Sequence, residues 1–292
     1  MRIIPLAALG LALLLLSGCA AVPYQYTENI EAPNLLELRP GEAQIERGRP
    51  VAFVDGIGHY FFSLPSKLIL WNWRVDNHNV SAETEAALSA YLAANDLDNV
   101  KVRINQYAPG GEWRRLVLNR SINGFWRYTF GVIATTFYTI KPGRVFGGDN
   151  YNPYTNTINI YSDHSSIAVH EGAHAKDFAT REHKGSYAAA RMIPLFPLYQ
   201  EAVATGDAIG YVRDRELPEE ERKDYKILYP AYGTYIAGEG LGLASWFTPI
   251  SYPVQLGVQL GVAIPGHIVG RIKAANIDEP TEPGTPAISL VK

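Results

Sequence analysis

Residues 170–174 read His-Glu-Gly-Ala-His, and this short motif decides how the surrounding chain is expected to fold. On an α-helix, residues four positions apart lie one turn apart on the same face. His170 and His174 can therefore bind one zinc ion through neutral imidazoles, and Glu171 can then accept a proton from a water molecule on that ion. The motif predicts one zinc ion per chain, bound on a helix.

The sequence around the motif favours a helix. Three residues before the motif can cap the start of a helix: Ser162, Asp163 and Ser165. The apolar face is supplied by Ile167, Ala168, Val169, Ala173 and Phe178, and Gly185 can end the helix. Gly172 costs up to ~1 kcal/mol relative to alanine inside a helix. We therefore expect it to face an open cleft, where it leaves room for a substrate. The alternative is an exposed helix whose two histidines bind no metal.

A short strand is predicted directly before this helix. Residues 157–161 alternate apolar and polar side chains, as a half-buried strand does. Residues 144–146, followed by two glycines, are predicted as an earlier strand. The residues between the two strands are typical of turns: Asn150, Asn152, Pro153 and Asn156. A strand beside the helix can pair with an extended peptide backbone.

A strand followed closely by a helix with His170, Glu171 and His174 resembles the zincin metallopeptidases. The resemblance covers about residues 80–240 and is specific only at the helix. It implies an α+β fold in which a small sheet has an edge strand beside the metal helix, followed by a mostly helical C-terminal part. It also implies that the two histidines bind zinc, that Glu171 is the general base, and that the substrate is a peptide or protein.

A catalytic zinc needs a third protein ligand. The metzincin branch would have glycine and histidine where this chain has Asp177 and Thr180, so that branch does not fit. The gluzincin branch takes a glutamate from a later helix. Residues 198–212 are predicted to form one, and Glu201 lies near its start. By this resemblance Glu201 is the third ligand.

Other residues remain candidates for the same site. Asp177, one turn beyond His174, is an alternative ligand or a partner that orients a ligand histidine, and Glu239 in a Gly-Glu-Gly loop is an alternative third ligand. Families of this type often place an aspartate four residues after the glutamate, where this chain has Thr205, with Asp207 two positions further. Thermolysin-like enzymes use a tyrosine or histidine to bind the oxyanion, for which three tyrosines are candidates: Tyr229, Tyr232 and Tyr235.

The N-terminus predicts a lipid anchor. Residues 1–18 combine an early arginine with an apolar run too short to span a bilayer comfortably, and Leu-Ser-Gly-Cys ends at Cys19, the only cysteine. This string resembles the bacterial lipobox, which implies removal of residues 1–18 and lipidation of Cys19. No aspartate follows the cysteine, so the outer membrane is favoured over the inner membrane. The alternative is a plain signal peptide or a short membrane helix.

The remaining sequence predicts one domain with extensions. Residues 19–48 contain prolines and charges and are predicted to be a tether, residues 49–270 the zincin-like domain, and residues 271–292 a disordered tail. The net charge of −3 and the lack of a basic run exclude a nucleic-acid partner. No pattern indicates the oligomeric state.

Four further segments have recognisable patterns. Ser81 is predicted to cap a helix over residues 82–94, and residues 100–104 alternate as a strand does. Residues 125–140 are apolar and aromatic, which fits a core helix or a lipid-facing surface helix. Residues 241–270 are almost uncharged and rich in glycine; they are expected to be buried, with contact to the bilayer as the alternative.

These patterns lead to one expected function and two rivals. The expectation is a zinc-dependent peptidase of the bacterial cell envelope. A scaffold or binding lipoprotein with a zincin-like fold and no turnover is the first rival, and a zinc-dependent amidase acting on cell-wall peptide is the second. The identity of the substrate is not encoded in any pattern.

Overall fold

A small mixed sheet organises the α+β fold. The computed structural model describes Tyr24 and residues 36–277. Its sheet contains β1 (Ile45–Arg47), β2 (Lys101–Ile104), β3 (Asn150–Asn152) and β4 (Thr157–Ile160). The strand order is β1-β2-β4-β3, in which β1, β2 and β4 are parallel and β3 lies antiparallel to β4 at the edge.

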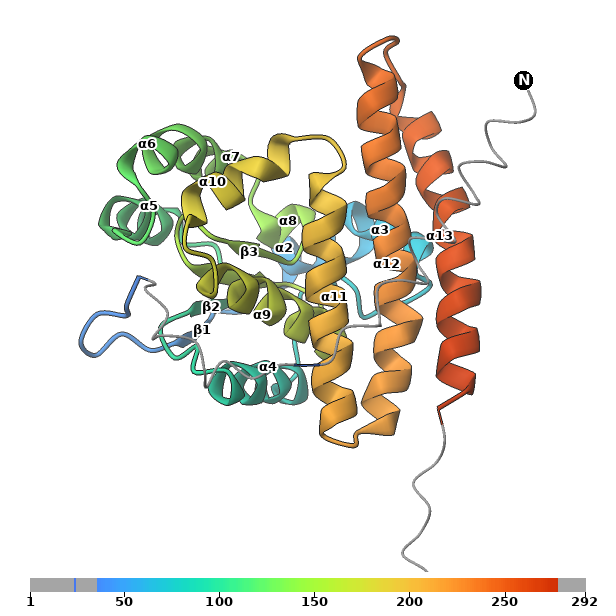
Figure 1. The fold of residues 1–292 in the computed structure, drawn as a ribbon, viewed down its shortest axis with the longest axis horizontal. Helices are drawn as coiled ribbons and strands as arrows, with labels where there is room; N and C mark the ends of the chain where they lie inside the picture. The colour runs from blue at the N-terminus through green and yellow to red at the C-terminus, as the bar shows by residue number, and fades with distance from the viewer. Residues whose placement is uncertain (1–23, 25–35, 278–292) are drawn as a thin grey trace, which may run out of the picture.

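Helices make up most of the remaining structure. Those before β4 are α2 (Ala52–Ile57), η2 (Gly58–Phe62), α3 (Leu64–Leu70), α4 (Ala82–Ala94), α5 (Pro109–Leu118), α6 (Gly124–Trp126), η3 (Arg127–Gly131), α7 (Val132–Ile140) and α8 (Gly143–Phe146). Those after it are α9 (Ser165–Ala179), α10 (Lys184–Ala189), η4 (Ala190–Met192), α11 (Phe196–Asp214), α12 (Pro218–Ser245) and α13 (Tyr252–Ala275). The three long helices α11, α12 and α13 lie side by side (Figure 1).

The main core lies where α9 packs against the sheet, α4 and α11. Its buried side chains include Leu88, Leu92, Val102, Ile158, Ala173 and Ala208. Gly172 lies in this contact: a Cβ there would meet the ring of Tyr91 at 2.7 Å. The expectation that Gly172 faces an open cleft was therefore wrong, because the missing side chain makes room for α4.

Three sequence predictions are confirmed. Helix α4 covers residues 82–94 and begins after Ser81, whose Oγ accepts the Thr84 N–H. Strands β2 and β4 lie within the predicted ranges 100–104 and 157–161. In these segments local capping and alternation agree with the tertiary structure.

Other boundaries were wrong. The predicted strand 144–146 is helix α8, and residues 150–152, predicted as turn, form β3 because they pair with β4. The metal helix ends at Ala179 rather than Gly185. Strand β1 lies within residues 19–48, predicted as a tether, and α13 ends at Ala275, inside the segment predicted as a disordered tail.

The C-terminal part of the fold differs from what its composition predicted. Helix α12 is the longest of the described helices and has Pro230 inside it. Residues 241–270 were expected to be buried, but most of residues 241–262 are exposed. In the part of the chain that the structure describes, no helix is both long and apolar enough to cross a membrane. The predicted signal peptide, Cys19 and most of the tail lie outside the described residues.

Asp163 does not cap the metal helix; it binds the start of α4 instead. Its Oδ1 accepts the Ser81 N–H at 2.9 Å and the hydroxyls of Ser81 and Thr84, and its Oδ2 accepts from Arg74 at 2.8 Å. Burial alone would raise the pKa of Asp163, but these hydrogen bonds outweigh it and lower the pKa to about 2. The ionised carboxylate therefore links α4 to the loop before α9.

Asp163→Asn is expected to lower the free energy of unfolding at pH 7 by about 2 kcal/mol, from the difference between the ordinary pKa and about 2. Because the folded-state pKa is depressed, this stabilisation is present above about pH 4 and is lost as the pH falls towards 2. Urea unfolding with a chelator present, at pH 7 and at low pH, measures it. The exposed Asp98→Asn is the control, and an equal loss in both variants, or a pH-independent loss, contradicts the account.

Candidate metal centre

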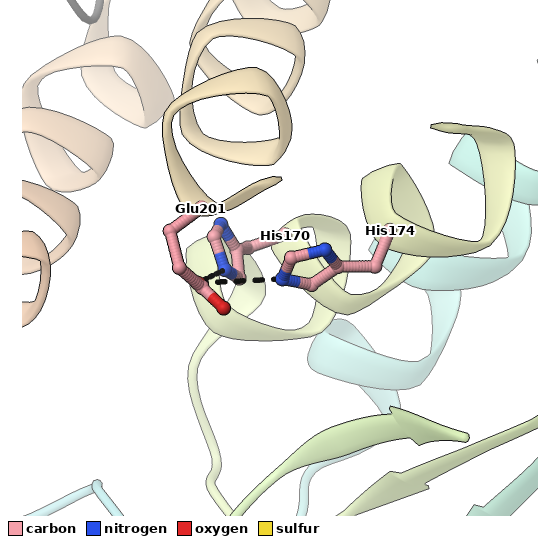
Figure 2. A group of neighbouring side chains, drawn as sticks. All are labelled: His170, His174 and Glu201. Atoms are coloured by element: carbon pink, nitrogen blue, oxygen red, sulfur yellow. Dashed lines mark hydrogen bonds and ion pairs between the residues drawn. The ribbon is translucent and has the colours of Figure 1, made fainter. Parts of the chain in front are cut away.

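Three buried side chains from two helices meet at one point. His170 and His174 lie one turn apart on α9, and Glu201 comes from the second turn of α11, which packs against α9. Figure 2 shows both imidazole rings turned toward the Glu201 carboxylate. One ligand atom from each residue lies within 4.8 Å of the other two. The structure thus brings together the three residues that the sequence singled out as ligands.

The spacing suits a zinc ion. Ligand atoms about 2.0–2.2 Å from a tetrahedral ion are about 3.3–3.6 Å from one another. Glu201 Oε2 lies 3.1 Å from His170 Nε2 and 3.3 Å from His174 Nε2. Two imidazole nitrogens and one carboxylate oxygen are also a donor set that zinc favours. A zinc ion therefore fits between these residues with small side-chain movements.

The electrostatics of the cluster keep Glu201 ionised. Burial raises the pKa of Glu201, but His174, His170 and Arg191 outweigh it and hold that pKa well below its usual range. Burial lowers the pKa of His174, but the carboxylates of Glu201 and Glu171 together outweigh it, so the net direction is upward. A deprotonated carboxylate is the form that binds a metal.

Arg191, from η4, was not found by the sequence analysis. Its guanidinium donates to Glu201 Oε1 and, at 3.2 Å, to the side chain of Gln200. This contact orients the carboxylate so that Oε2 faces the histidines. No local pattern marks an arginine ten residues before a ligand, because the contact depends on the turn between α10 and α11.

Glu171 lies beside the three ligands and lines a cleft. The cleft has a volume of about 410 Å³ and is also lined by His174, Arg191, Glu201 and Tyr235. Burial raises the pKa of the Glu171 carboxyl, although the two histidines oppose the shift. A buried carboxylate next to such a cluster can accept a proton from a bound water molecule.

The edge strand β3 forms another wall of the cleft. Asn150, Tyr151 and Asn152 all line it, together with aromatic residues of α7 and neighbouring segments: Phe137, Tyr138, Tyr154 and Phe178. β3 pairs with β4 on one side only, so the described residues leave its other edge unpaired. The cleft therefore combines a free strand edge with an aromatic wall.

Asp177, Glu239 and Asp207 do not join the metal cluster. Asp177 accepts from Arg181 and Tyr187, and Glu239 accepts the Leu195 N–H at 2.6 Å. Asp207 pairs with Lys176 at 2.6 Å and accepts from a second group, the Tyr91 hydroxyl. These carboxylates are engaged elsewhere, which excludes them as ligands in this arrangement.

The residues expected to support the ligands are only partly in place. Thr205 is buried one turn after Glu201 and lines a neighbouring cavity with His170. His170 Nδ1 is buried and has no hydrogen-bond partner in the described part of the chain. The aspartate that usually orients a ligand histidine from this position has no counterpart here.

Of the three candidate tyrosines, Tyr235 lies at the site. It lines the cleft from α12, and the nearby Glu201 carboxylate, together with burial, raises its pKa well above the usual value. Tyr232 instead donates to the Leu198 carbonyl at 3.1 Å. Tyr229 is buried in the main core.

No family model matches the chain, and neither a curated protein nor a solved structure is significantly similar to it.

Proposed function

We propose that this protein is a zinc-dependent peptidase of the gluzincin type, with a zincin-like fold. The convergence of His170, His174 and Glu201 beside Glu171 is the observation that carries the proposal. Three protein ligands leave one coordination position for water or substrate, as in catalytic rather than structural zinc sites. The strand–helix order before and at α9 supports the same assignment.

The chain's own residues can perform the proton transfers of hydrolysis. When bound by His170, His174 and Glu201, zinc would acidify water and polarise a substrate carbonyl. Glu171 takes the proton from the attacking water and delivers it to the leaving amine. Arg191 keeps Glu201 oriented, and Tyr235, which lines the cleft with its hydroxyl bonded to Glu201, would donate a hydrogen bond to the oxyanion of a bound substrate.

The cleft favours an extended peptide as substrate. A peptide can add to the free edge of β3 through main-chain hydrogen bonds, which bind many sequences without selecting one. The aromatic wall then favours substrates with an apolar side chain near the cleaved bond. An extended cell-wall peptide would fit the same cleft, so a zinc-dependent amidase that cuts cell-wall peptide is consistent with these features as well.

The proposed location is the bacterial cell envelope. The lipobox-like string ending at Cys19 supports attachment to the bilayer by lipid, with the outer membrane favoured because no aspartate follows the cysteine.

A non-catalytic scaffold or binding lipoprotein is the second candidate. One observation favours it: Arg191 and the two histidines already balance the charge of Glu201, so the cluster can persist without metal. The lack of a hydrogen-bond partner for His170 Nδ1 also favours the scaffold, because one of the three ligands then has no group that orients it.

Metal analysis and a peptide digest of the chain from Ala20 separate these candidates. We expect about one zinc per chain and cleavage of a mixed-peptide library, read by mass spectrometry, that a chelator abolishes and added zinc restores. Zinc without cleavage of peptides or cell-wall fragments favours the scaffold. Absence of zinc contradicts the proposal.

A further inference from the structure

The turn between α12 and α13 carries an exposed apolar tip. No residue from 238 to 262 is buried, and the flanking Ala237 and Ala263 are the first buried residues on either side. At 1.5 Å per residue, the unburied part of α12 is about 12 Å long and that of α13 about 16 Å. Figure 1 shows this hairpin tip standing clear of the rest of the described fold at the top of the view.

From Gly240 onwards the tip is uncharged and aromatic. Between Glu239 and Arg271 the chain carries no Asp, Glu, Lys or Arg. Trp246, Phe247 and Tyr252 are 72, 89 and 65% exposed around the turn, and Val254 is 54% exposed. A contiguous apolar surface of this kind marks an interaction site rather than a water-facing one.

Glycines distinguish the tip from the base of the same hairpin. At the base, Gly233, Gly266 and Gly270 are needed for close helix contact, because a Cβ on each would lie 2.2–2.8 Å from the backbone of the other helix. At the tip, Gly238, Gly240, Gly242, Gly257 and Gly261 have open space where a Cβ would be. Contacts within the described fold therefore do not explain the composition of the tip.

We propose that this tip inserts into the surface of a lipid bilayer. Tryptophan and tyrosine prefer the interface between headgroups and acyl chains, and Trp246 and Tyr252 flank the turn on its two sides. Phe247 and Ile250 then reach the acyl boundary, while the polar backbone of the turn stays at headgroup depth, where water can satisfy it. Since neither helix is apolar enough to cross the membrane, the contact is with one leaflet.

Lipid fits this surface better than a second protein chain. Specific protein interfaces carry roughly one hydrogen bond per 100–200 Å² and are enriched in arginine, whereas the only charged group of the tip is Glu239 at its base, which already accepts the Leu195 N–H. Binding to a bilayer surface requires neither specific hydrogen bonds nor arginine side chains. The lipobox-like sequence independently predicts attachment to a membrane, and the tip would then give a second, non-covalent contact that orients the protein.

Vesicle flotation of the chain from Ala20, which keeps every residue of the described fold and lacks the lipid, tests the proposal. We expect it to bind vesicles of phosphatidylethanolamine with a minor fraction of phosphatidylglycerol, with little loss in high salt, because the contact is apolar. Trp246→Glu/Phe247→Glu should weaken binding at least ~10-fold. The control pair Phe125→Glu/Tyr128→Glu, also exposed aromatics but on α6 and η3, should bind as the parent does.

A cysteine probe tests the depth of insertion. Cys19 is the only cysteine, so the chain from Ala20 has none, and a fluorophore can be attached at Ser245→Cys or at the control Ser186→Cys. Both serines are exposed, and each donates to a carbonyl of its own helix region. On vesicles, only the Ser245 probe should shift to shorter wavelength and be quenched by brominated lipid.

Three results would overturn the inference. The first is a parent chain with no affinity for vesicles, and the second is a double glutamate variant that binds as tightly as the parent. The third is a parent that is a dimer in solution and a double variant that is a monomer, which would show that a second copy covers the tip. Cleavage of soluble peptides should be unchanged in the double variant, so this test is independent of the proposed peptidase activity.

Discussion

Glu171→Gln is expected to abolish at least ~99% of peptide cleavage while leaving zinc content and folding nearly intact, since general-base catalysis contributes ~10²-fold or more. The amide has almost the same shape but cannot accept the proton of the attacking water. Glu171 is beside the three ligands and is not one of them, so metal binding should survive. The measurement is kcat on a cleaved peptide, together with metal content and the unfolding midpoint.

Glu182→Gln is the matched control, because this glutamate is exposed just beyond the end of α9. It should cleave peptides as the parent does. If the parent and Glu171→Gln bind zinc equally and cut peptides equally, Glu171 is not the base. If neither cuts any peptide or cell-wall substrate, the scaffold candidate becomes the better one.

The site was more predictable from sequence than the fold around it. Two histidines four residues apart are fixed on one face by the helix itself, so their geometry is local. The choice of Glu201 needed a resemblance to gluzincins, and the structure brings it to the histidines through the packing of α11 on α9. Arg191 was missed because its contact with Glu201 has no local signal.

The wrong predictions about the fold also arose from contacts that local sequence patterns do not show. Asn150 and Asn152 are typical turn residues, yet pairing with β4 makes them an edge strand. Gly172 was expected to face a cleft, but Tyr91 occupies the space beside it, and that contact joins residues far apart in the sequence. Local preference is overridden wherever a distant segment supplies the hydrogen bond or the packing.

Residues 241–262 show a further limit of sequence patterns. Apolar composition predicts that water is excluded from a surface, but it does not say whether protein or lipid excludes it. The sequence prediction assumed that other parts of the protein cover residues 241–270, which is the more common situation for an apolar segment. The open space around Gly257 and Gly261, visible only in the structure, shows that protein does not cover them within the described residues.

His174→Ala should remove the metal altogether, because the two remaining ligands hold zinc poorly. Besides metal analysis, thermal unfolding gives a readout that does not need a substrate. Zinc at ~1,000 times its Kd stabilises the folded parent by about 4 kcal/mol, which corresponds to roughly 7 °C in Tm for a chain of this size. His174→Ala should show almost none of this zinc-dependent shift.

His183→Ala is the control for this variant, since His183 is exposed beyond α9 and outside the cluster. It should retain the full zinc-dependent shift and about one zinc per chain. Retention of stoichiometric zinc by His174→Ala would show that another group holds the ion. Together, His174→Ala and Glu171→Gln separate metal binding from proton transfer. His174→Ala should lose zinc, whereas Glu171→Gln should lose turnover and retain zinc. Only a catalytic metal centre produces this pattern.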